Sequence, residues 1–429
     1  MTALIAQKPV VLPENSLHSG RVKAPGLRLT GMEVVSRQYN PHPCQLNRGS
    51  FHAGPSVRNF REGQLVEPDA IETELKAIWE KLAQENKTRA CLFNLIVFNR
   101  YSVRTDYIRS IAQRVVEKFP CRLLFISEDP QAEKPYLKTA VSVIVPQNGE
   151  SSIACDHIDI GVGGSDIERT PYLLLPHILP DLPTTLLWTE DPSIPHPLFQ
   201  PLTKLAHRVI FDSESADNLF SFAKTVRALK NQGTFDVADL NWARTEEWRD
   251  LLASLFHTPE KLILLQEIKQ LHVVYNQRPT EYFCHLKIQS IYMLAWLASR
   301  LDWQCEKKDP ALQFECVLSG PPSGSLSKQA PINVSMGTAC LENLGPGTVI
   351  SIRLETKKQD IIHCYRLEKQ PQYVNVEIVS QEKWDVPYQF LLAQTATGHS
   401  LVQEICQRGT SVHYLEMLDA LMVLDRENI

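Results

Sequence analysis

The segment CLFNLIVF (residues 91–98) is a continuous apolar run of strand length. After it, residues 106–119 are amphipathic, with apolar side chains on one helical face, and Pro120 ends the segment. The run RLLFI (residues 122–126) then predicts a second buried strand. Strands that are apolar on both faces are typical of a parallel sheet that helices cover. The three segments therefore predict a β-α-β unit.

The same alternation continues along the first half of the chain. A helix is predicted from Ile71, where apolar residues repeat at helical spacing after Pro68 and Asp69. The other predicted strands lie at residues 140–145, 153–160, 184–188 and 208–211, and the other predicted helices at residues 167–179, 198–206 and 217–231. Alternation at this spacing predicts a doubly wound, Rossmann-like α/β domain with a mostly parallel sheet.

After residues 233–239 the order of predicted elements changes. Helices are predicted at residues 245–256, 259–275 and 290–301, and strands at residues 312–318, 332–336, 348–355, 361–367 and 373–379. Short polar links join the last three strands, which is typical of an antiparallel meander. Two further helices begin at Ser400 and Ser411. The second half is therefore expected to be an α+β domain.

The expected domain organisation has three parts. Residues 1–66 are rich in Pro, Gly, Asn and Ser and show weak periodicity, so an irregular N-terminal arm is expected there. The α/β domain is expected at residues 67–235 and the α+β domain at residues 236–429, with the boundary placed where the pattern changes.

Composition excludes several classes of protein. Of the 429 residues, 43% are hydrophobic and 22% are charged, as in an ordinary globular protein. The formal net charge of -5 argues against nucleic-acid binding, which usually needs a broad basic face. The longest apolar segment, residues 172–188, is crossed by prolines, and no signal peptide is recognisable. The sequence thus predicts a soluble, cytoplasmic protein with neither a membrane nor a nucleic-acid partner.

The ten cysteines show no CxxC motif and no clustering with histidine. We therefore expect no zinc site and no metal. Several cysteines lie in strand-like apolar runs, which is typical of reduced thiols that serve as small core residues. The cysteines expected to be buried and reduced on this basis are Cys91, Cys121, Cys155, Cys316 and Cys364.

A glycine-rich turn, GVGGSD (residues 161–166), follows a predicted strand and opens a predicted helix. Backbone amides at such a turn can bind an anion, which makes Gly163, Gly164 and Ser165 a candidate anion-binding turn. The segment matches neither GxGxxG nor a Walker loop, and Asp166 would repel a phosphate. An ordinary strand-to-helix turn with a Ser or Asp cap is the favoured interpretation.

The segment LPDLPTTLLWTEDP (residues 179–192) places Trp188 at the carboxyl end of a predicted parallel strand. Ligands of open α/β sheets bind at that edge, where Asp191 could bind a hydroxyl group or a cation. The alternative is a strand end packed by an aromatic ring and followed by an Asp-Pro turn. The sequence leaves both interpretations open.

The segment DLNWARTEEWRDLLASLF (residues 239–256) contains a helix with Thr245 as its N-cap. Trp and Arg side chains beyond those that the helix needs are typical anchors of protein interfaces. The alternative is that they join the two domains, and we favour it slightly. The candidate partner-binding residues from both segments are Trp188, Asp191, Asp239, Trp242, Arg244, Trp248 and Arg249.

Conventional catalytic motifs are missing from the sequence. The thirteen histidines form no HExxH pattern, and there is no GxSxG nucleophile elbow. We therefore expect no catalytic residues and no cofactor, although catalytic groups can converge from distant segments.

Five segments resemble the OpcA family of glucose-6-phosphate dehydrogenase assembly proteins. LPDLPTTLLWTEDP (179–192) resembles the family's LPDLP-strand-Trp-acid-Pro motif, and DLNWARTEEWRDLLASLF (239–256) is similar to its most specific signature. The other three segments are FPCRLLFI (119–126), RVIFDS (208–213) and WLASRLDW (296–303). They occur in the family's order, from about residue 75 onward. Many members carry two adjacent aromatic residues where this chain has Trp188 alone.

The resemblance implies a function without catalysis. It implies a partner that helps glucose-6-phosphate dehydrogenase reach or keep its active oligomer, and so favours NADPH supply through the oxidative pentose phosphate pathway. The competing hypotheses are a sugar-phosphate- or nucleotide-binding α/β enzyme and a ligand-sensing regulator. An anion-lined cleft at the carboxyl edge of the sheet would favour the enzyme, and an aromatic and arginine patch without such a cleft would favour the partner.

Overall fold

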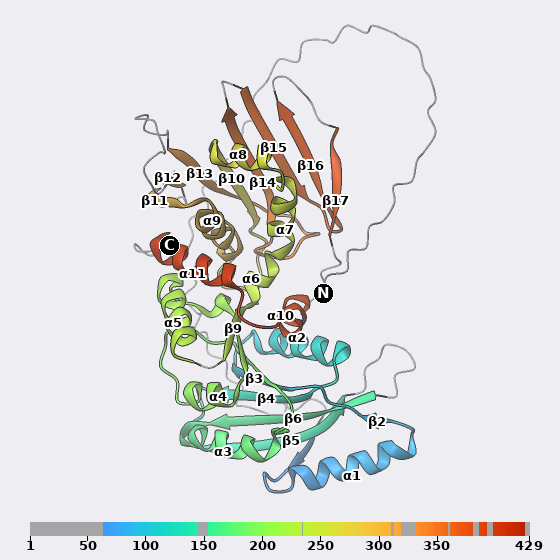
Figure 1. Ribbon diagram of the computed structural model, residues 1–429. Helices are drawn as coiled ribbons and strands as arrows, with labels where there is room; N and C mark the ends of the chain where they lie inside the picture. Colours follow the sequence, from blue (N-terminus) through green and yellow to red (C-terminus); the bar gives the residue numbers. More distant parts are fainter. Residues whose placement is uncertain are drawn as a thin grey trace, which may run out of the picture. The chain divides into compact units, whose positions relative to one another are not determined.

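Two large β-sheets organise the chain (Figure 1). The computed structural model describes residues 63–144, 153–233, 235–309, 313–318, 331–358, 361–380, 386–392 and 398–424. These residues belong to one compact unit, and most of the predicted N-terminal arm lies outside them. No helix in these ranges is both long and apolar enough to cross a membrane.

The first sheet is built around six parallel strands. These are β3 (Asn94–Arg100), β4 (Arg122–Asp129), β6 (Ile153–Gly163), β7 (Thr184–Trp188), β8 (Arg208–Phe211) and β9 (Asp236–Asp239). Their spatial order is β6-β4-β3-β7-β8-β9, so numbered along the chain the order is 3-2-1-4-5-6. This is the order of doubly wound dinucleotide-binding sheets. The predicted α/β fold class is confirmed.

Three more strands make the sheet mixed at one end. β5 (Tyr136–Ile144) pairs antiparallel with β6, and β1 (Gln64–Val66) pairs antiparallel with β5. The short strand β2 (Thr88–Arg89) pairs parallel with β6. The chain reverses between β4 and β5 without a helix, so the strand predicted at residues 140–145 runs opposite to its neighbours.

Helices cover both faces of the first sheet, as the continuous apolar strands predict. Ile96 and Phe98 of β3 pack into one hydrophobic cluster, whereas Leu95 and Val97 pack on the opposite face beneath α2. The helices of this half are α1 (Ile71–Gln84), α2 (Thr105–Lys118), α3 (Thr170–Leu174), α4 (Phe199–Leu205) and α5 (Leu219–Gln232). The helix predicted at residues 167–179 is only partly correct. Pro171 and Pro176 restrict it to the five residues of α3, between two 3-10 turns.

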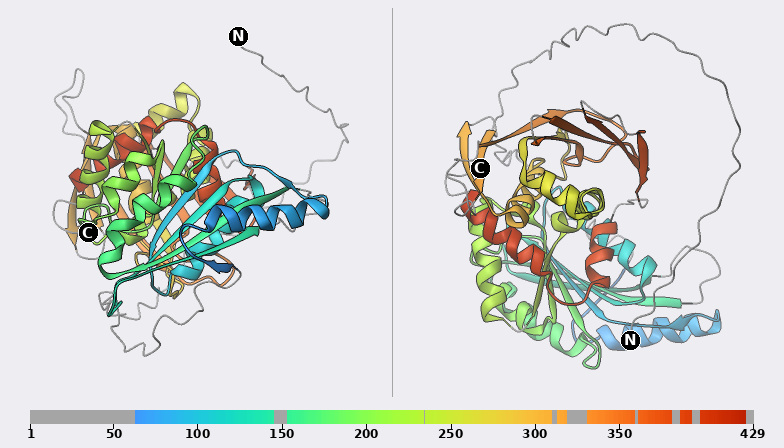
Figure 2. Two further views of the ribbon diagram at one scale, coloured as in Figure 1. Left: turned by 90° about the horizontal axis from the view of Figure 1, so that it is seen from below. Right: turned by 45° about the horizontal axis from the view of Figure 1, so that its top comes forward.

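The second sheet has the order β11-β12-β13-β10-β14-β15-β16-β17. Its strands are β10 (Ile268–Asn276), β11 (Trp303–Asp309), β12 (Gln313–Leu318), β13 (Ile332–Ala339), β14 (Val349–Lys358), β15 (Ile361–Lys369), β16 (Tyr373–Ser380) and β17 (Tyr388–Leu391). Strands β14, β15 and β16 form the predicted antiparallel meander, and β17 extends it by a strand that was not predicted. Among the described strands of this sheet, only β10 and β13 pair in parallel. The right-hand view of Figure 2 shows helices against one face of this sheet.

Six helices accompany the second sheet and the end of the chain. They are α6 (Leu240–Arg244), α7 (Glu246–Leu255), α8 (Pro259–Gln266), α9 (Ile288–Leu301), α10 (His399–Cys406) and α11 (Val412–Leu424). The last two return to the first half. Leu401 and Val402 of α10 pack in the cluster beneath α2, and α11 packs between α5 and α9. Arg208 of β8 also donates to Glu404 of α10, at 2.6 Å.

The helix predicted at residues 259–275 is wrong in its second half. α8 ends at Gln266, and β10 begins at Ile268 and occupies the centre of the second sheet. Leu271, Val273 and Tyr275 alternate on the buried face, a period of two that the preceding apolar run obscures. The predicted change of pattern at residues 233–239 contains β9, which pairs with β8 in the first sheet. The division of domains at residues 235 and 236 stays a prediction.

The expectation of reduced cysteines is wrong for one pair. Cys305 of β11 and Cys316 of β12 are direct cross-strand neighbours and form a disulfide. The pairing depends on strand register, because the two residues are eleven positions apart and form no short motif. Among the other cysteines predicted to be buried, Cys121, Cys155 and Cys364 are buried free thiols and Cys91 is half-buried.

This arrangement predicts which thiols react in the native protein. Cys284, Cys340 and Cys406 are exposed and should react rapidly with a maleimide. The thiols of Cys121 and Cys155 should react only after denaturant is added, because burial raises the pKa of both and blocks access. Peptide mass spectrometry before and after denaturation measures this difference. Native labelling of Cys121 would contradict the packing beneath α2.

Candidate functional site

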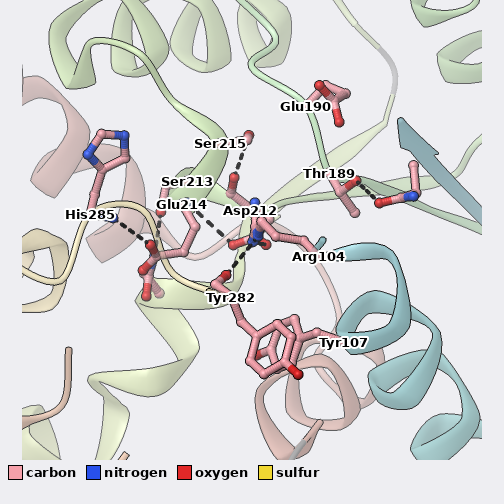
Figure 3. A network of polar contacts seen from close by, with 12 residues as sticks. Arg104, Tyr107, Thr189, Glu190, Asp212, Ser213, Glu214, Ser215, Tyr282 and His285 are labelled. Carbon is pink, nitrogen blue, oxygen red and sulfur yellow. Dashed lines mark hydrogen bonds and ion pairs between the residues drawn. The ribbon is translucent and has the colours of Figure 1, made fainter. Parts of the chain in front are cut away.

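A network of polar contacts lies at the carboxyl edge of the first sheet (Figure 3). The switch point of the strand order lies there, between β3 and β7, and ligands of such sheets bind at that point. The cluster joins the loops that follow β3, β8 and β9 to residues 277–287, which connect β10 with α9. We call residues 277–287 the strap.

Arg104 links three of these segments. It lies immediately before α2, and its Nη2 contacts Asp212 Oδ2 at 2.5 Å. Its Nε donates a hydrogen bond to the backbone carbonyl of Tyr282 in the strap, at 2.8 Å. Burial lowers the pKa of Arg104, but Asp212 and Glu214 raise it by more, so the net shift is upward. The side chain therefore stays charged and holds the strap to the end of β8.

Asp239 closes the end of β9. It is fully buried and caps α6, with Oδ1 accepting hydrogen bonds from the amides of Asn241 (2.8 Å) and Trp242 (2.9 Å). Its other oxygen accepts from the amide of Ser213, after β8, at 3.0 Å. Burial raises the pKa of Asp239 to about 7, against the lowering effect of these hydrogen bonds.

Arg244 comes from the end of α6 and contacts both the acids and the aromatic rings. It donates to Asn241 Oδ1 at 2.8 Å and to the Tyr107 hydroxyl at 3.0 Å. Its Nη1 lies 3.9 Å from Asp212 and 4.0 Å from Glu214. The guanidinium also lies 5.0 Å from the ring centre of Phe283 in the strap.

Glu214 is the carboxylate most affected by its surroundings. Burial raises its pKa to about 7, Asp212 adds to this shift, and Arg244 and Arg104 oppose it. Its Oε1 accepts from Asn241 Nδ2 and its Oε2 from the amide of His285 in the strap, both at 3.2 Å. Burial also lowers the pKa of His285. Perturbed groups in one place mark candidate functional sites as well as structural networks.

A second group of ion pairs flanks the switch point. Glu128, at the end of β4, contacts Arg100 Nε at 3.3 Å and His196 Nε2 at 2.9 Å. Burial raises the pKa of Glu128, but His196 and Arg100 outweigh it and lower the pKa overall. Glu190, after β7, accepts a long hydrogen bond from the Arg100 amide, at 3.3 Å, and burial raises its pKa.

The structure buries both candidate residues of the segment 179–192, Trp188 and Asp191. Trp188 is fully buried and stacks on Phe98, with ring centres 4.3 Å apart. Asp191 accepts hydrogen bonds from the amides of Ser193 (2.8 Å) and Asp217 (3.0 Å), as an Asp-Pro turn requires. These contacts match the structural alternative for this segment.

Of the remaining candidate residues, Trp242 and Trp248 are also buried. The guanidinium of Arg249 lies 3.4 Å from the ring centre of Trp242 and donates to the Trp242 carbonyl at 2.6 Å. Burial lowers the pKa of Arg249 to about 10, so it stays protonated at neutral pH. The structure thus brings Asp239, Trp242, Arg244 and Arg249 together around α6. Their role in binding a partner stays a prediction.

The glycine turn is explained by packing. A side chain at Gly163 would meet Ala132 at 2.4 Å and the Tyr136 ring at 2.7 Å, and Gly164 has a φ of +62° against Pro135. Ser165 is exposed and follows in a 3-10 turn of six residues rather than a long helix. Anion binding by Gly163, Gly164 and Ser165 stays a prediction without a structural feature that favours it.

Sequence reasoning missed most of the network. Arg104 and Tyr107, Asp212 and Glu214, and the strap come from three distant segments. One available signal was the run Asp-Ser-Glu directly after the strand RVIF, because the carboxyl ends of parallel strands meet at one edge. Within the described ranges, no group of three or more His, Cys, Asp or Glu side chains is arranged to hold a metal ion.

Two family models match the chain. Residues 112–228 match the model described as the glucose-6-phosphate dehydrogenase subunit N-terminal domain, and residues 236–418 match the corresponding C-terminal domain. Together the two matches cover more than half of the chain.

Proteins named OxPP cycle protein OpcA are similar in sequence. The protein from Synechocystis sp. (strain PCC 6803) is 29% identical over 196 residues, which are 45% of this chain and 39% of that protein. The protein from Nostoc punctiforme is 28% identical over 197 residues, which are 45% of this chain and 40% of that protein. The match therefore spans about two fifths of the length of these relatives.

Solved structures show only distant similarity. The probable oxidoreductase yhhX aligns over 78% of this chain and 96% of its own, with 14% identity and a TM-score of 0.41. The transcriptional regulator Gal80p from Kluyveromyces lactis aligns over 81% and 96%, with 9% identity and a TM-score of 0.42. Similarity this low supports no statement about function.

Proposed function

Because the chain belongs to the OpcA family of glucose-6-phosphate dehydrogenase subunits, we propose that it is a non-catalytic partner of that dehydrogenase. It acts in the cytoplasm, where it promotes the active oligomer of the dehydrogenase and so the supply of NADPH through the oxidative pentose phosphate pathway.

The observation that carries this proposal is the family match over both halves of the chain. One model runs from within α2 into α5 and includes β4 to β8, and the other runs from β9 into α11. A chain that retains both parts retains the scaffold on which the family's function depends. The names of the curated relatives point to the same pathway.

The contacts at the carboxyl edge favour a role without catalysis. Arg104 and Arg244 are engaged by Asp212, Glu214 and neighbouring groups of the same chain. Aromatic rings and arginines gather there, and the ion pairs are internal. This pattern is expected of a structural or partner-binding protein, rather than of an enzyme with an anion-lined cleft.

A physical mechanism for activation follows from linkage. A partner that binds the active oligomer of the dehydrogenase more tightly than its inactive form shifts the population toward the active form. The size of the shift is set by the ratio of the two affinities. No new catalytic group is needed.

Two observations favour an alternative. The first sheet has the strand order of nucleotide-binding α/β proteins. Carboxylates with raised pKa values, such as Glu214 and Asp239, also occur at the functional sites of enzymes and ligand-sensing regulators. The alternative function is therefore a sugar-phosphate- or nucleotide-binding enzyme that uses this edge.

An activity assay separates the two functions. The purified chain alone should reduce no NADP⁺ with glucose 6-phosphate. Added to the dehydrogenase of the same organism, it should raise the rate of NADPH formation and the fraction of dehydrogenase in the larger oligomer, measured by absorbance and native mass spectrometry. The heat-denatured chain serves as the control.

Two results would contradict the proposal. Turnover by the chain alone would favour the enzyme. An unchanged rate and an unchanged oligomer, at dehydrogenase concentrations where the inactive form dominates, would refute the partner role. If the chain does bind the dehydrogenase, each of the seven candidate residues can be replaced in turn, and the melting temperature and the partner affinity of each variant measured.

A further inference from the structure

The strand order of the first sheet implies a dinucleotide site at its carboxyl edge. Such a site needs glycines after the first parallel strand, so that the backbone can approach the pyrophosphate. It also needs free amides at the start of the following helix, because these bind the phosphate oxygens.

The turn after β3 does not fit a pyrophosphate. Residues 99–104 (NRYSVR) contain no glycine, so side chains project where the backbone would have to approach. The turn is also satisfied internally. The Ser102 amide donates to Thr105 Oγ1 at 2.9 Å, and the Arg104 amide donates to Ser102 Oγ at 3.2 Å.

The charges at this edge are also unfavourable for phosphate. Carboxylates follow three neighbouring parallel strands, namely Glu190 after β7, Asp212 and Glu214 after β8, and Asp239 at the end of β9. The two nearest arginines, Arg104 and Arg244, are already held by these acids. A phosphate would have to break ion pairs that are shielded from water.

The strap occupies the edge instead. Its backbone is bound at two points, since the Tyr282 carbonyl accepts from Arg104 and the His285 amide donates to Glu214. Its rings pack on α2, with Tyr282 stacked on Tyr107 at 5.7 Å and Phe283 edge-on to the same ring at 5.4 Å. Figure 3 shows Tyr282 and His285 reaching Arg104 and Glu214 from the second half of the chain.

The second sheet holds the start of the strap. The Gln277 amide donates to the Ala339 carbonyl at 2.8 Å, and Arg278 Nη1 donates to the Glu342 carbonyl at 2.7 Å. Next to it, Asn276 Nδ2 donates to the carbonyls of Leu341 and Leu344, both at 2.9 Å. The strap is thus tied to the second sheet at one end and to the first sheet along its length.

We infer that the carboxyl edge of the first sheet binds the chain's own strap, residues 277–287, in the place where related folds bind a dinucleotide. The edge acts as an internal clamp that fixes the first sheet to the second. This inference does not rest on the proposed function, because it concerns contacts within one chain.

Hydrogen exchange of the full chain tests the clamp. In Arg104→Ala, which loses the contacts with Asp212 and Tyr282, the amides of residues 277–287 should exchange about tenfold faster or more. Arg300→Ala, which removes an exposed pair with Glu416, is the matched control and should leave the strap unchanged. Calorimetric titration of the wild type with NAD⁺ and NADP⁺ should give no binding up to millimolar concentration.

Each readout can overturn the inference. If the amides of the strap exchange at the same rate in Arg104→Ala and in the wild type, the clamp is refuted. If NADP⁺ binds and slows amide exchange at residues 99–104, the edge is a dinucleotide site and the inference is wrong. If Arg104→Ala does not fold, Tyr107→Leu serves instead, because it removes the ring on which Tyr282 and Phe283 of the strap pack. Faster strap exchange in that variant supports the clamp, and unchanged exchange counts against it.

Discussion

Asp156→Ala should lower the free energy of unfolding by about 3–5 kcal/mol, because it removes one side of a buried ion pair. Asp156 lies on β6, is 3% exposed and contacts Arg122, which is 2% exposed, at 2.9 Å. It also accepts hydrogen bonds from Trp79 Nε1 (2.6 Å) and Arg89 Nη2 (2.5 Å). Without it, the buried Arg122 guanidinium keeps the half-exposed Glu72 and the His177 carbonyl as its partners among the described residues.

Urea unfolding at neutral pH measures this loss. Glu416→Ala, which removes an exposed pair with Arg300, is the control and should cost less than about 1 kcal/mol. Asp156→Asn keeps the shape and one acceptor, so its cost should lie between the two. A loss below that of Glu416→Ala would show that the charge of Arg122 is neutralised by other groups.

Glu214→Gln should change how stability depends on pH. The pKa of Glu214 is about 7 in the folded chain and 4.5 when unperturbed, so the unfolded state releases its proton first. The contribution of Glu214 to stability is therefore complete below pH 4.5 and is lost as the pH rises to about 7. At about 1.4 kcal/mol per pKa unit, the loss amounts to about 3 kcal/mol. Gln cannot ionise and avoids this loss.

The measurement is the free energy of unfolding of both proteins between pH 5 and pH 8. The difference between Glu214→Gln and wild type should grow in favour of the variant up to about pH 7 and stay constant above it. Glu281→Gln, in the strap but exposed, is the control and should follow the wild type. Parallel curves for wild type and Glu214→Gln would mean that Glu214 is already ionised at pH 5.

The sequence predicted the first sheet well because its signal is local. The parallel strands β3, β4, β7 and β8 are buried on both faces and contain apolar runs such as Thr184–Trp188. The second sheet was harder. β10 follows an apolar helix directly and was read as its continuation. The disulfide between Cys305 and Cys316 depends on register, which no single segment contains.

The candidate site was predicted in part, for a similar reason. Asp239 and Arg244 were recognised because their segment contains more Trp and Arg than its helix needs, and both belong to the network. Trp188 and Asp191 were recognised from their position at a strand end, but their contacts are those of packing and of a turn. Arg104 and the strap come together only in the folded chain, so single segments could not reveal them.

The return of α10 and α11 to the first half has a consequence for biosynthesis. Leu401 and Val402 cover the apolar surface of α2. Glu404, the partner of Arg208, lies almost two hundred residues after it in the sequence. While the ribosome is still making the second sheet, the nascent first half therefore has an uncovered apolar surface and a cation without its partner. Its final packing is completed only after α10 has been synthesised, so termination before residue 399 should yield a chain that chaperones retain.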